Sequence, residues 1–200
     1  IAMTAVTPHT PAPLEEMSLS EVTRCYRDYI SADMARLLRL TGFGSMEMKA
    51  EGCWVFDEQG RRYLDFSGGY GVFTLGHRHP KVVEAVKDQL DSLALSSRAF
   101  FNPLQAKLAE KLASITPGDL RYSFFSNSGT EAIEAALKAA RLATGRTGFV
   151  SLEGSYHGKT FGALSVSGRE KYKEPFQPLL PGCHVVGLED LEALDRALDE

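Results

Sequence analysis

Cysteine is scarce in this sequence: Cys25, Cys53 and Cys183 are the three in 200 residues, and they lie far apart without a Cys-x-x-Cys spacing. Zinc sites and disulfide frameworks need closely spaced or paired cysteines, so neither is expected, and free thiols fit a reducing compartment such as the cytoplasm. No apolar run approaches the roughly 20 residues that a membrane span needs. The formal net charge of −4 offers no basic surface, which argues against a nucleic-acid partner.

What the chain does contain is ordinary for a globular protein. Hydrophobic residues make up 44% and charged residues 24%, so there is enough apolar surface to build a core and extensive disorder is not expected. Residues 1–17 are rich in Thr, Pro and Ala and lack the positively charged start of a signal peptide. We expect this segment to be a flexible leader or linker.

Helical and strand patterns follow one another in the first half of the chain. Ser18 and Glu21 have the spacing of a capping box, and apolar residues recur at helical intervals as far as Leu40. The segment 46–66 then changes to β-prone residues around turn chemistry at 57–60, which predicts a hairpin or meander. Two further helices are expected after Pro80 and after Pro103.

The second half alternates between strands and helices. Strands are predicted at 122–125, 148–152 and 183–186, and helices at 130–143, from near Gly158, and at 188–198. Strands separated by helices are typical of a parallel α/β sheet. We therefore expect an α/β protein with three parts: the leader at 1–17, an N-terminal helix and β-meander at 18–79, and the first part of a large α/β domain at 80–200.

The strongest local signal for binding is Ser126-Asn127-Ser128-Gly129-Thr130-Glu131, which lies between a predicted strand and a predicted helix. Backbone N–H groups at a helix start are unpaired and the helix dipole is positive there. Gly129 allows a ligand to approach the backbone, and the Ser128 and Thr130 hydroxyls add donors. The motif predicts a phosphate cradle. Simple helix capping by Ser128 or Thr130 explains the same residues, and local chemistry does not choose between the two.

A second signal is Gly154-Ser155-Tyr156-His157-Gly158-Lys159-Thr160, which follows another predicted strand. It nearly matches the nucleotide-binding P-loop pattern, but Glu153 stands where the first glycine is required and would repel a triphosphate. An alternative use is presentation of Tyr156 over a flat ligand ring, with the glycines making room. A tyrosine packed in an ordinary loop is the third possibility.

Several other polar residues have simpler explanations. His77 and His79 are poorly spaced for two ligands of one metal, and no nearby cluster completes a site, so we interpret them as turn and helix-start residues and expect no metal. On the helix predicted at 130–143, charged residues recur every three or four positions. We favour a solvated face for Lys138, whereas Glu134 and Arg141 remain open because part of such a helix can face a site.

Together these motifs resemble class III aminotransferases, which are pyridoxal-phosphate (PLP) enzymes of fold type I. The resemblance rests on Phe124 to Glu131 with Glu134 to Lys138 and Arg141, on Tyr156 to Thr160, and on Leu64-Asp65-Phe66 with Gly76-His77-Arg78-His79-Pro80. It runs from about Met46 to Glu200 in the family's order. Within the family, the segments 116–118, 122–125 and 175–182 are most similar to putrescine aminotransferases, and then to acetylornithine and ornithine aminotransferases.

The resemblance implies a cofactor and roles for individual residues. It assigns Ser128, Gly129 and Thr130 to the phosphate of PLP, and Tyr156 to stacking on the pyridine ring with His157 beside it. Glu134 would support the site from the helix, and Tyr70 would lie near the substrate entrance. The family also implies a homodimer with sites at the interface, and transfer of an amino group from an amine donor to a 2-oxo acid such as 2-oxoglutarate. A PLP enzyme of another reaction type stays open as an alternative.

Two departures from the family pattern matter. Acetylornithine aminotransferases have arginine at the position of Lys159, where it grips the α-carboxylate of the substrate. Lysine cannot form that bidentate pair, so an ω-amine or diamine donor is favoured. The family's catalytic lysine, which holds PLP as a Schiff base, is expected beyond Glu200, and no catalytic residue besides the supporting Glu134 is assigned here. A chain that ended at Glu200 would not catalyse transamination.

Overall fold

The computed structural model describes residues 17–41, 44–97 and 99–199, and it forms two compact units that divide between residues 97 and 98. The expected leader lies outside the described residues except for its last one. The boundary between the two units lies one helix later in the chain than the domain boundary that the sequence predicted between residues 79 and 80. The predicted domain boundary remains a prediction. Among the described residues, no helix combines the length and apolar character that crossing a membrane requires.

The first unit begins with two helices where the sequence predicted one. They are joined by a π-helical turn: α1 (Leu19–Cys25), η2 (Tyr26–Ile30) and α2 (Ala32–Leu40). The expected capping box of Ser18 and Glu21 is present at the start of α1. The single-helix prediction was wrong because Ser31 has an extended backbone, with φ −166°, and its hydroxyl accepts a hydrogen bond from the Met34 N–H as the N-cap of α2.

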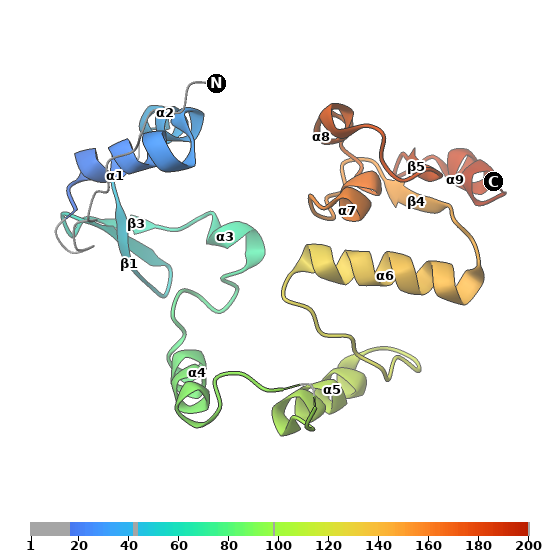
Figure 1. The fold of residues 1–200 in the computed structure, drawn as a ribbon, viewed down its shortest axis with the longest axis horizontal. Helices are drawn as coiled ribbons and strands as arrows, with labels where there is room; N and C mark the ends of the chain where they lie inside the picture. The colour runs from blue at the N-terminus through green and yellow to red at the C-terminus, as the bar shows by residue number, and fades with distance from the viewer. Residues whose placement is uncertain (1–16, 42–43, 98, 200) are drawn as a thin grey trace. The chain divides into compact units, whose positions relative to one another are not determined.

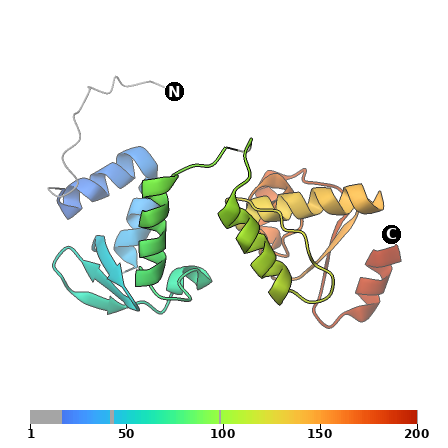
Figure 2. The same cartoon turned by 90° about the horizontal axis from the view of Figure 1, so that it is seen from below.

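The predicted meander is confirmed as a three-stranded antiparallel sheet in the order β1-β2-β3 (Figure 2). Its strands are β1 (Glu47–Glu51), β2 (Trp54–Asp57) and β3 (Arg62–Leu64). The turn is held by Asp57, whose side chain accepts hydrogen bonds from Arg61 Nε at 2.6 Å and from the Tyr63 hydroxyl at 2.9 Å. Burial raises the pKa of Asp57, but these donors outweigh it and lower the pKa to about 2.

A second carboxylate, Asp65, fixes the glycine-rich segment that follows the sheet. It accepts hydrogen bonds from the backbone N–H groups of Ser67 and Gly68, and its Oδ2 lies 2.7 Å from His77 Nε2. The prediction of a turn at His77 was wrong, because its backbone exchanges two hydrogen bonds with Gly52 in an isolated antiparallel β-bridge. His79 is the N-cap of α4 (Pro80–Ser92), as predicted. Between Asp65 and His77 lies the short helix α3 (Gly68–Gly71), in which Tyr70 has a left-handed φ of 56°.

Acid should destabilise this first unit through Asp65. The hydrogen bond with His77 is the main reason that the pKa of Asp65 falls from 3.8 to about 2. A carboxyl whose folded-state pKa is depressed stabilises the fold above its ordinary pKa, and this contribution disappears as the pH falls from about 4 towards 2. We expect Asp65→Asn to unfold more easily than the wild type at pH 6 and to lose less stability than the wild type between pH 5 and pH 3.

Urea unfolding of the complete protein at each pH checks this prediction. Asp57 titrates in the same window in both proteins, so the difference between the two profiles isolates Asp65. Parallel profiles for the wild type and Asp65→Asn would show that the carboxylate makes no such contribution.

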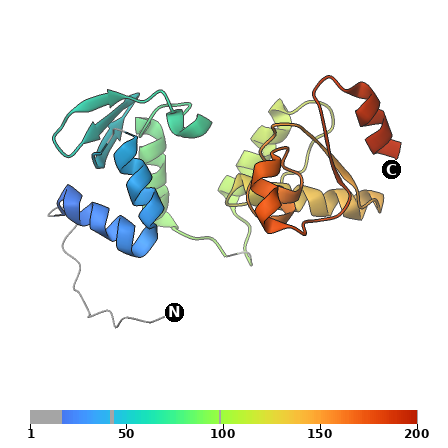
Figure 3. The ribbon, with the colours of Figure 1, turned by 90° about the horizontal axis from the view of Figure 1, so that it is seen from above.

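The second unit contains the predicted parallel pair of strands. Its elements are α5 (Pro103–Ile115), α6 (Gly129–Thr144), β4 (Phe149–Leu152), α7 (Phe161–Ser165), α8 (Glu170–Lys173), η3 (Glu174–Phe176), β5 (Cys183–Val186) and α9 (Leu191–Asp199). β4 and β5 pair in parallel with Phe149 opposite Cys183. α9 lies against both strands, and α6 runs alongside α7 (Figures 1 and 3). The mixed α/β fold class is thus confirmed.

The best-buried part of the second unit is the short helix α7 and the residues after it. Residues 162–167 are all buried, and Ala163 has no exposed surface. One strand prediction was wrong: residues 122–125 form no strand, and Tyr122 and Phe124 are 99% and 77% exposed. A strand exists only through ladder hydrogen bonds to a neighbour, and the described residues supply none to this segment.

Candidate functional site

The predicted phosphate cradle is the N-terminus of α6, a helix of 16 residues. Ser128 is its N-cap: its Oγ accepts a hydrogen bond from the Glu131 N–H at 3.3 Å, and its carbonyl accepts one from the Ala132 N–H at 3.1 Å. The N–H groups of Gly129 and Thr130 donate to no acceptor within the described part of the chain. Capping and anion binding are therefore compatible here, because the cap uses donors further along the helix.

The space in front of these donors is open. A Cβ built on Gly129 would meet nothing within 4 Å. The Ser128 hydroxyl accepts from Glu131 and keeps its own proton for a further acceptor. Two backbone donors, one hydroxyl and the positive end of the helix dipole therefore face an accessible space, which fits a phosphate group.

The loop that carries Tyr156 lies directly against this helix start. Gly158 is buried and has a φ of +128°, and a Cβ there would overlap the Thr130 side chain. The Thr160 hydroxyl oxygen lies 3.0 Å from that of Thr130. Tyr156 itself is 57% exposed. The two segments that the sequence singled out are thus brought together, although 30 residues separate the two threonines.

The other side of this loop is held by the buried segment after α7. The His157 N–H donates to the Oγ of Ser167 at 3.4 Å, and Ser167 is only 1% exposed. The Gly168 N–H donates to the Ser155 carbonyl at 3.0 Å, and the Gly154 N–H donates to the Gly168 carbonyl at 2.9 Å. Backbone bonds on both sides of Tyr156 therefore fix the position from which its ring projects.

Glu134 connects α6, the loop and α7. Its Oε1 accepts hydrogen bonds from the Thr160 hydroxyl at 2.5 Å and from the Ala163 N–H at 3.1 Å. The Thr160 hydroxyl is the main cause that lowers the pKa of Glu134, against the opposing effect of burial. Glu134 is therefore a carboxylate at neutral pH. It caps α7 from a neighbouring helix, because Thr160, the N-cap residue of α7, makes no cap bond of its own.

This arrangement argues against the P-loop alternative. A P-loop needs free backbone N–H groups at the start of the helix that follows it. In α7, a helix of five residues, the Ala163 N–H already donates to Glu134, and the Gly162 backbone helps to lower the pKa of the same carboxylate. A triphosphate at this position would meet the carboxylate of Glu134.

The two expected substrate residues occupy different environments. Lys159 is exposed, and its Nζ lies 5.9 Å from the centre of the Tyr172 ring. Tyr70 belongs to the first unit, where its side chain is fully exposed. Their roles stay predictions.

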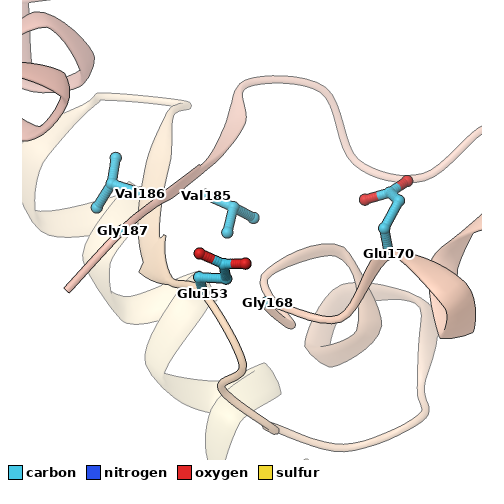
Figure 4. A pocket seen from close by; sticks show the side chains of 6 residues that line it. All are labelled: Glu153, Gly168, Glu170, Val185, Val186 and Gly187. Atoms are coloured by element: carbon cyan, nitrogen blue, oxygen red, sulfur yellow. The ribbon is translucent and has the colours of Figure 1, made fainter. Parts of the chain in front are cut away.

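A cavity of about 240 Å³ opens at the carboxyl ends of β4 and β5 (Figure 4). It is lined by Glu153, Gly168, Glu170, Val185, Val186 and Gly187. The lining includes no residue that the sequence assigned to the cofactor, and its two acidic side chains would repel a phosphate. In the part of the chain that the structure describes, no group of three or more His, Cys, Asp or Glu side chains is placed to hold a metal ion.

Sequence reasoning missed Ser167 and Gly162 as parts of this site, and it gave Thr160, the last residue of the second motif, no role of its own. Thr160 contacts Glu134 across 26 residues of sequence, and Ser167 contacts His157 across 10. A Cβ on Gly162 would overlap the Glu134 carboxylate, so the carboxylate can hold its present position because residue 162 is a glycine. The only sequence signal was the pair of glycines on either side of Thr160, which marks a close approach of backbone to a neighbour.

The family model of class-III aminotransferases matches residues 43–199. The chain belongs to this family. It is 43% identical over 188 residues to the putrescine aminotransferase of Pectobacterium atrosepticum, an alignment that covers 90% of this chain and 40% of that protein. The chain thus spans less than half the length of the curated relative that it matches.

Solved structures of aminotransferases share the fold. The ornithine aminotransferase of Toxoplasma gondii matches with a TM-score of 0.76 and 27% identity, over 94% of this chain and 44% of that one. An amine transaminase from an uncultivated Pseudomonas species, solved in a PLP-bound form, matches with a TM-score of 0.64 and 35% identity over 72% of this chain and 34% of that one. The chain therefore has part of the fold of type I PLP-dependent transferases, as the sequence predicted.

Proposed function

We propose that the N-terminus of α6 binds the phosphate of PLP and that the complete protein is a PLP-dependent aminotransferase. The observation that carries the proposal is the pair of unpaired N–H groups at Gly129 and Thr130, with the Tyr156 loop held against the same helix turn. Family membership and the aminotransferase relatives support the same reaction.

Each residue of the site then has a defined task. The Gly129 and Thr130 N–H groups and the Ser128 hydroxyl hold the phosphate, and Tyr156 covers one face of the ring with His157 beside it. Glu134 keeps the loop in place. When bound, the cofactor supplies an electron sink that allows an amino group to pass from a donor to a 2-oxo acid. These residues bind and orient, and the proton transfer belongs to the lysine that the family resemblance places beyond position 200.

The proposed donor is an ω-amine or diamine, and the acceptor is a 2-oxo acid such as 2-oxoglutarate. Lys159 supports the choice of donor because an ammonium group binds a carboxylate as a point charge, without the two parallel hydrogen bonds of arginine. The name of the 43% identical relative, putrescine aminotransferase, agrees with a diamine. We further propose a cytoplasmic homodimer with sites at its interface.

A donor screen on the complete protein tests this proposal. The protein should bind PLP, seen as a visible absorbance band that borohydride removes, and should form glutamate from 2-oxoglutarate with putrescine as donor. Failure to bind PLP would overturn the cofactor assignment. PLP binding with activity on α-amino acids but not on diamines would overturn only the donor assignment.

Lys159→Arg should shift donor preference. An arginine at this position adds a bidentate grip on carboxylates, so we expect the ratio of kcat/KM for N-acetylornithine to that for putrescine to rise by about tenfold, the effect of one charge-assisted hydrogen bond. Lys159→Met is the matched control, since it removes the charge of the lysine without adding the bidentate guanidinium group of arginine. An unchanged ratio in Lys159→Arg would show that this position does not contact the donor.

A further inference from the structure

The hydroxyl of Thr160 lies between two side chains of α6. Its Oγ1 is 2.5 Å from Glu134 Oε1 and 3.0 Å from Thr130 Oγ1. Glu134 is ionised, so it accepts and cannot donate. The single proton of the Thr160 hydroxyl therefore goes to Glu134, and the bond between the two threonines has only one possible direction: Thr130 donates and Thr160 accepts.

This direction has a consequence for Thr130. A threonine hydroxyl has one proton, and here Thr160 receives it. The Thr130 oxygen then presents only lone pairs to any other group, and lone pairs repel a phosphate oxygen. The N–H of Thr130 is unaffected and makes no hydrogen bond within the described part of the chain.

The same contacts set the position of the loop along the helix. Thr130 and Glu134 are four residues apart, so their side chains lie one above the other on one face of α6. Gly158 packs against Thr130, Thr160 bonds to both side chains, and Gly162 packs against Glu134. Alternate residues of the loop thus follow the helix face, and a shift of the loop along α6 would break all of these contacts together.

We propose that Thr130 binds the cofactor phosphate through its backbone N–H alone, and that its hydroxyl begins a one-way hydrogen-bond chain, Thr130 to Thr160 to Glu134, that positions the Tyr156 loop. Thr160 and Glu134 are positioning residues. The inference rests on the proposed function, since it takes the α6 N-terminus as the phosphate site. It differs from the expectation, made from the sequence, that the Thr130 hydroxyl donates to the ligand.

The affinities of the complete apoprotein for PLP and for pyridoxal, which lacks the phosphate, test this assignment. Removing one hydrogen bond of the chain from Thr130 to Glu134 should loosen the Tyr156 loop. The affinities for PLP and for pyridoxal should then both fall by about tenfold, which is the contribution of one hydrogen bond. We expect Thr130→Val and Thr160→Val to lower both affinities to the same extent, which leaves the ratio of the two affinities unchanged. The double variant should be no weaker than either single one, because both break one chain.

Two control variants separate positioning from phosphate contact and from misfolding. Thr160→Ser retains the hydroxyl but lacks the methyl group, and it should bind PLP and pyridoxal as the wild type does. If loss of the methyl group damaged the fold, this variant would bind both ligands weakly. Ser128→Ala removes a hydroxyl assigned to the phosphate and should weaken PLP while leaving pyridoxal unchanged.

The opposite pattern would overturn the inference. If Thr130→Val weakened PLP alone, and its effect added to that of Thr160→Val, the Thr130 hydroxyl would be a phosphate ligand. If the wild type itself bound PLP and pyridoxal equally well, the phosphate site and thus the proposed function would be at fault, and not the direction of the chain.

Discussion

Gly158→Ala should weaken PLP binding by the complete protein by a hundredfold or more. Gly158 has a φ of +128°, and a Cβ at this position would overlap the Thr130 side chain. A backbone conformation of this kind costs a non-glycine residue about 1–3 kcal/mol, and overpacking adds about 1–3 kcal/mol. The loop must leave the helix face to escape, and it takes Tyr156 with it. Titration of the apoprotein with PLP measures the effect.

Gly154→Ala is the matched control for this experiment. Gly154 belongs to the same loop and also has a positive φ, +76°, but a Cβ there would meet nothing within 4 Å. This variant carries backbone strain without the collision, so we expect a clearly smaller loss of PLP affinity than in Gly158→Ala. Equal losses in the two variants would mean that contact between Gly158 and Thr130 does not matter for binding.

Glu134→Ala should lower PLP affinity by roughly ten- to a hundredfold. The Thr160 hydroxyl and the Ala163 N–H both donate to this carboxylate, and a donor that loses its partner in a partly buried site costs about 1–3 kcal/mol. Glu134→Gln keeps the side-chain shape and one acceptor oxygen, so it should retain most of the affinity that Glu134→Ala loses. Thermal unfolding of the apoproteins, measured alongside, shows how much of each loss of PLP affinity comes from lower stability of the whole fold.

An exposed carboxylate provides the comparison for Glu134. Glu110 on α5 is exposed and its side chain makes no hydrogen bond among the described residues, so Glu110→Ala should bind PLP as the wild type does. If Glu134→Ala also bound PLP normally, the carboxylate would not hold the loop, and the positioning role of α6 would be refuted.

The local parts of the site could be predicted from the sequence. The residue types in the segment from Ser126 to Glu131 predict a helix start, because capping depends on residues within a few positions of each other. In the structure, α6 begins at Gly129, directly after its N-cap Ser128. The parallel pairing of β4 and β5 followed from the alternation of strand and helix patterns in the same way.

Contacts between distant residues could not be predicted. Nothing in the spacing of Glu134 and Thr160 shows that a carboxylate on one helix caps another, because that contact depends on how α6 and α7 pack. The break at Ser31 was missed for a different reason: helical periodicity continues across it, although the cap chemistry of a serine was visible. The segment 122–125 has strand composition, but composition does not supply a neighbouring strand.

The most direct test of the central claim is a crystal structure of the complete protein with PLP. We expect phosphate oxygens within hydrogen-bond distance of the Gly129 and Thr130 N–H groups, with the Tyr156 ring lying over the cofactor. A phosphate bound elsewhere, with these two N–H groups facing only solvent, would contradict it.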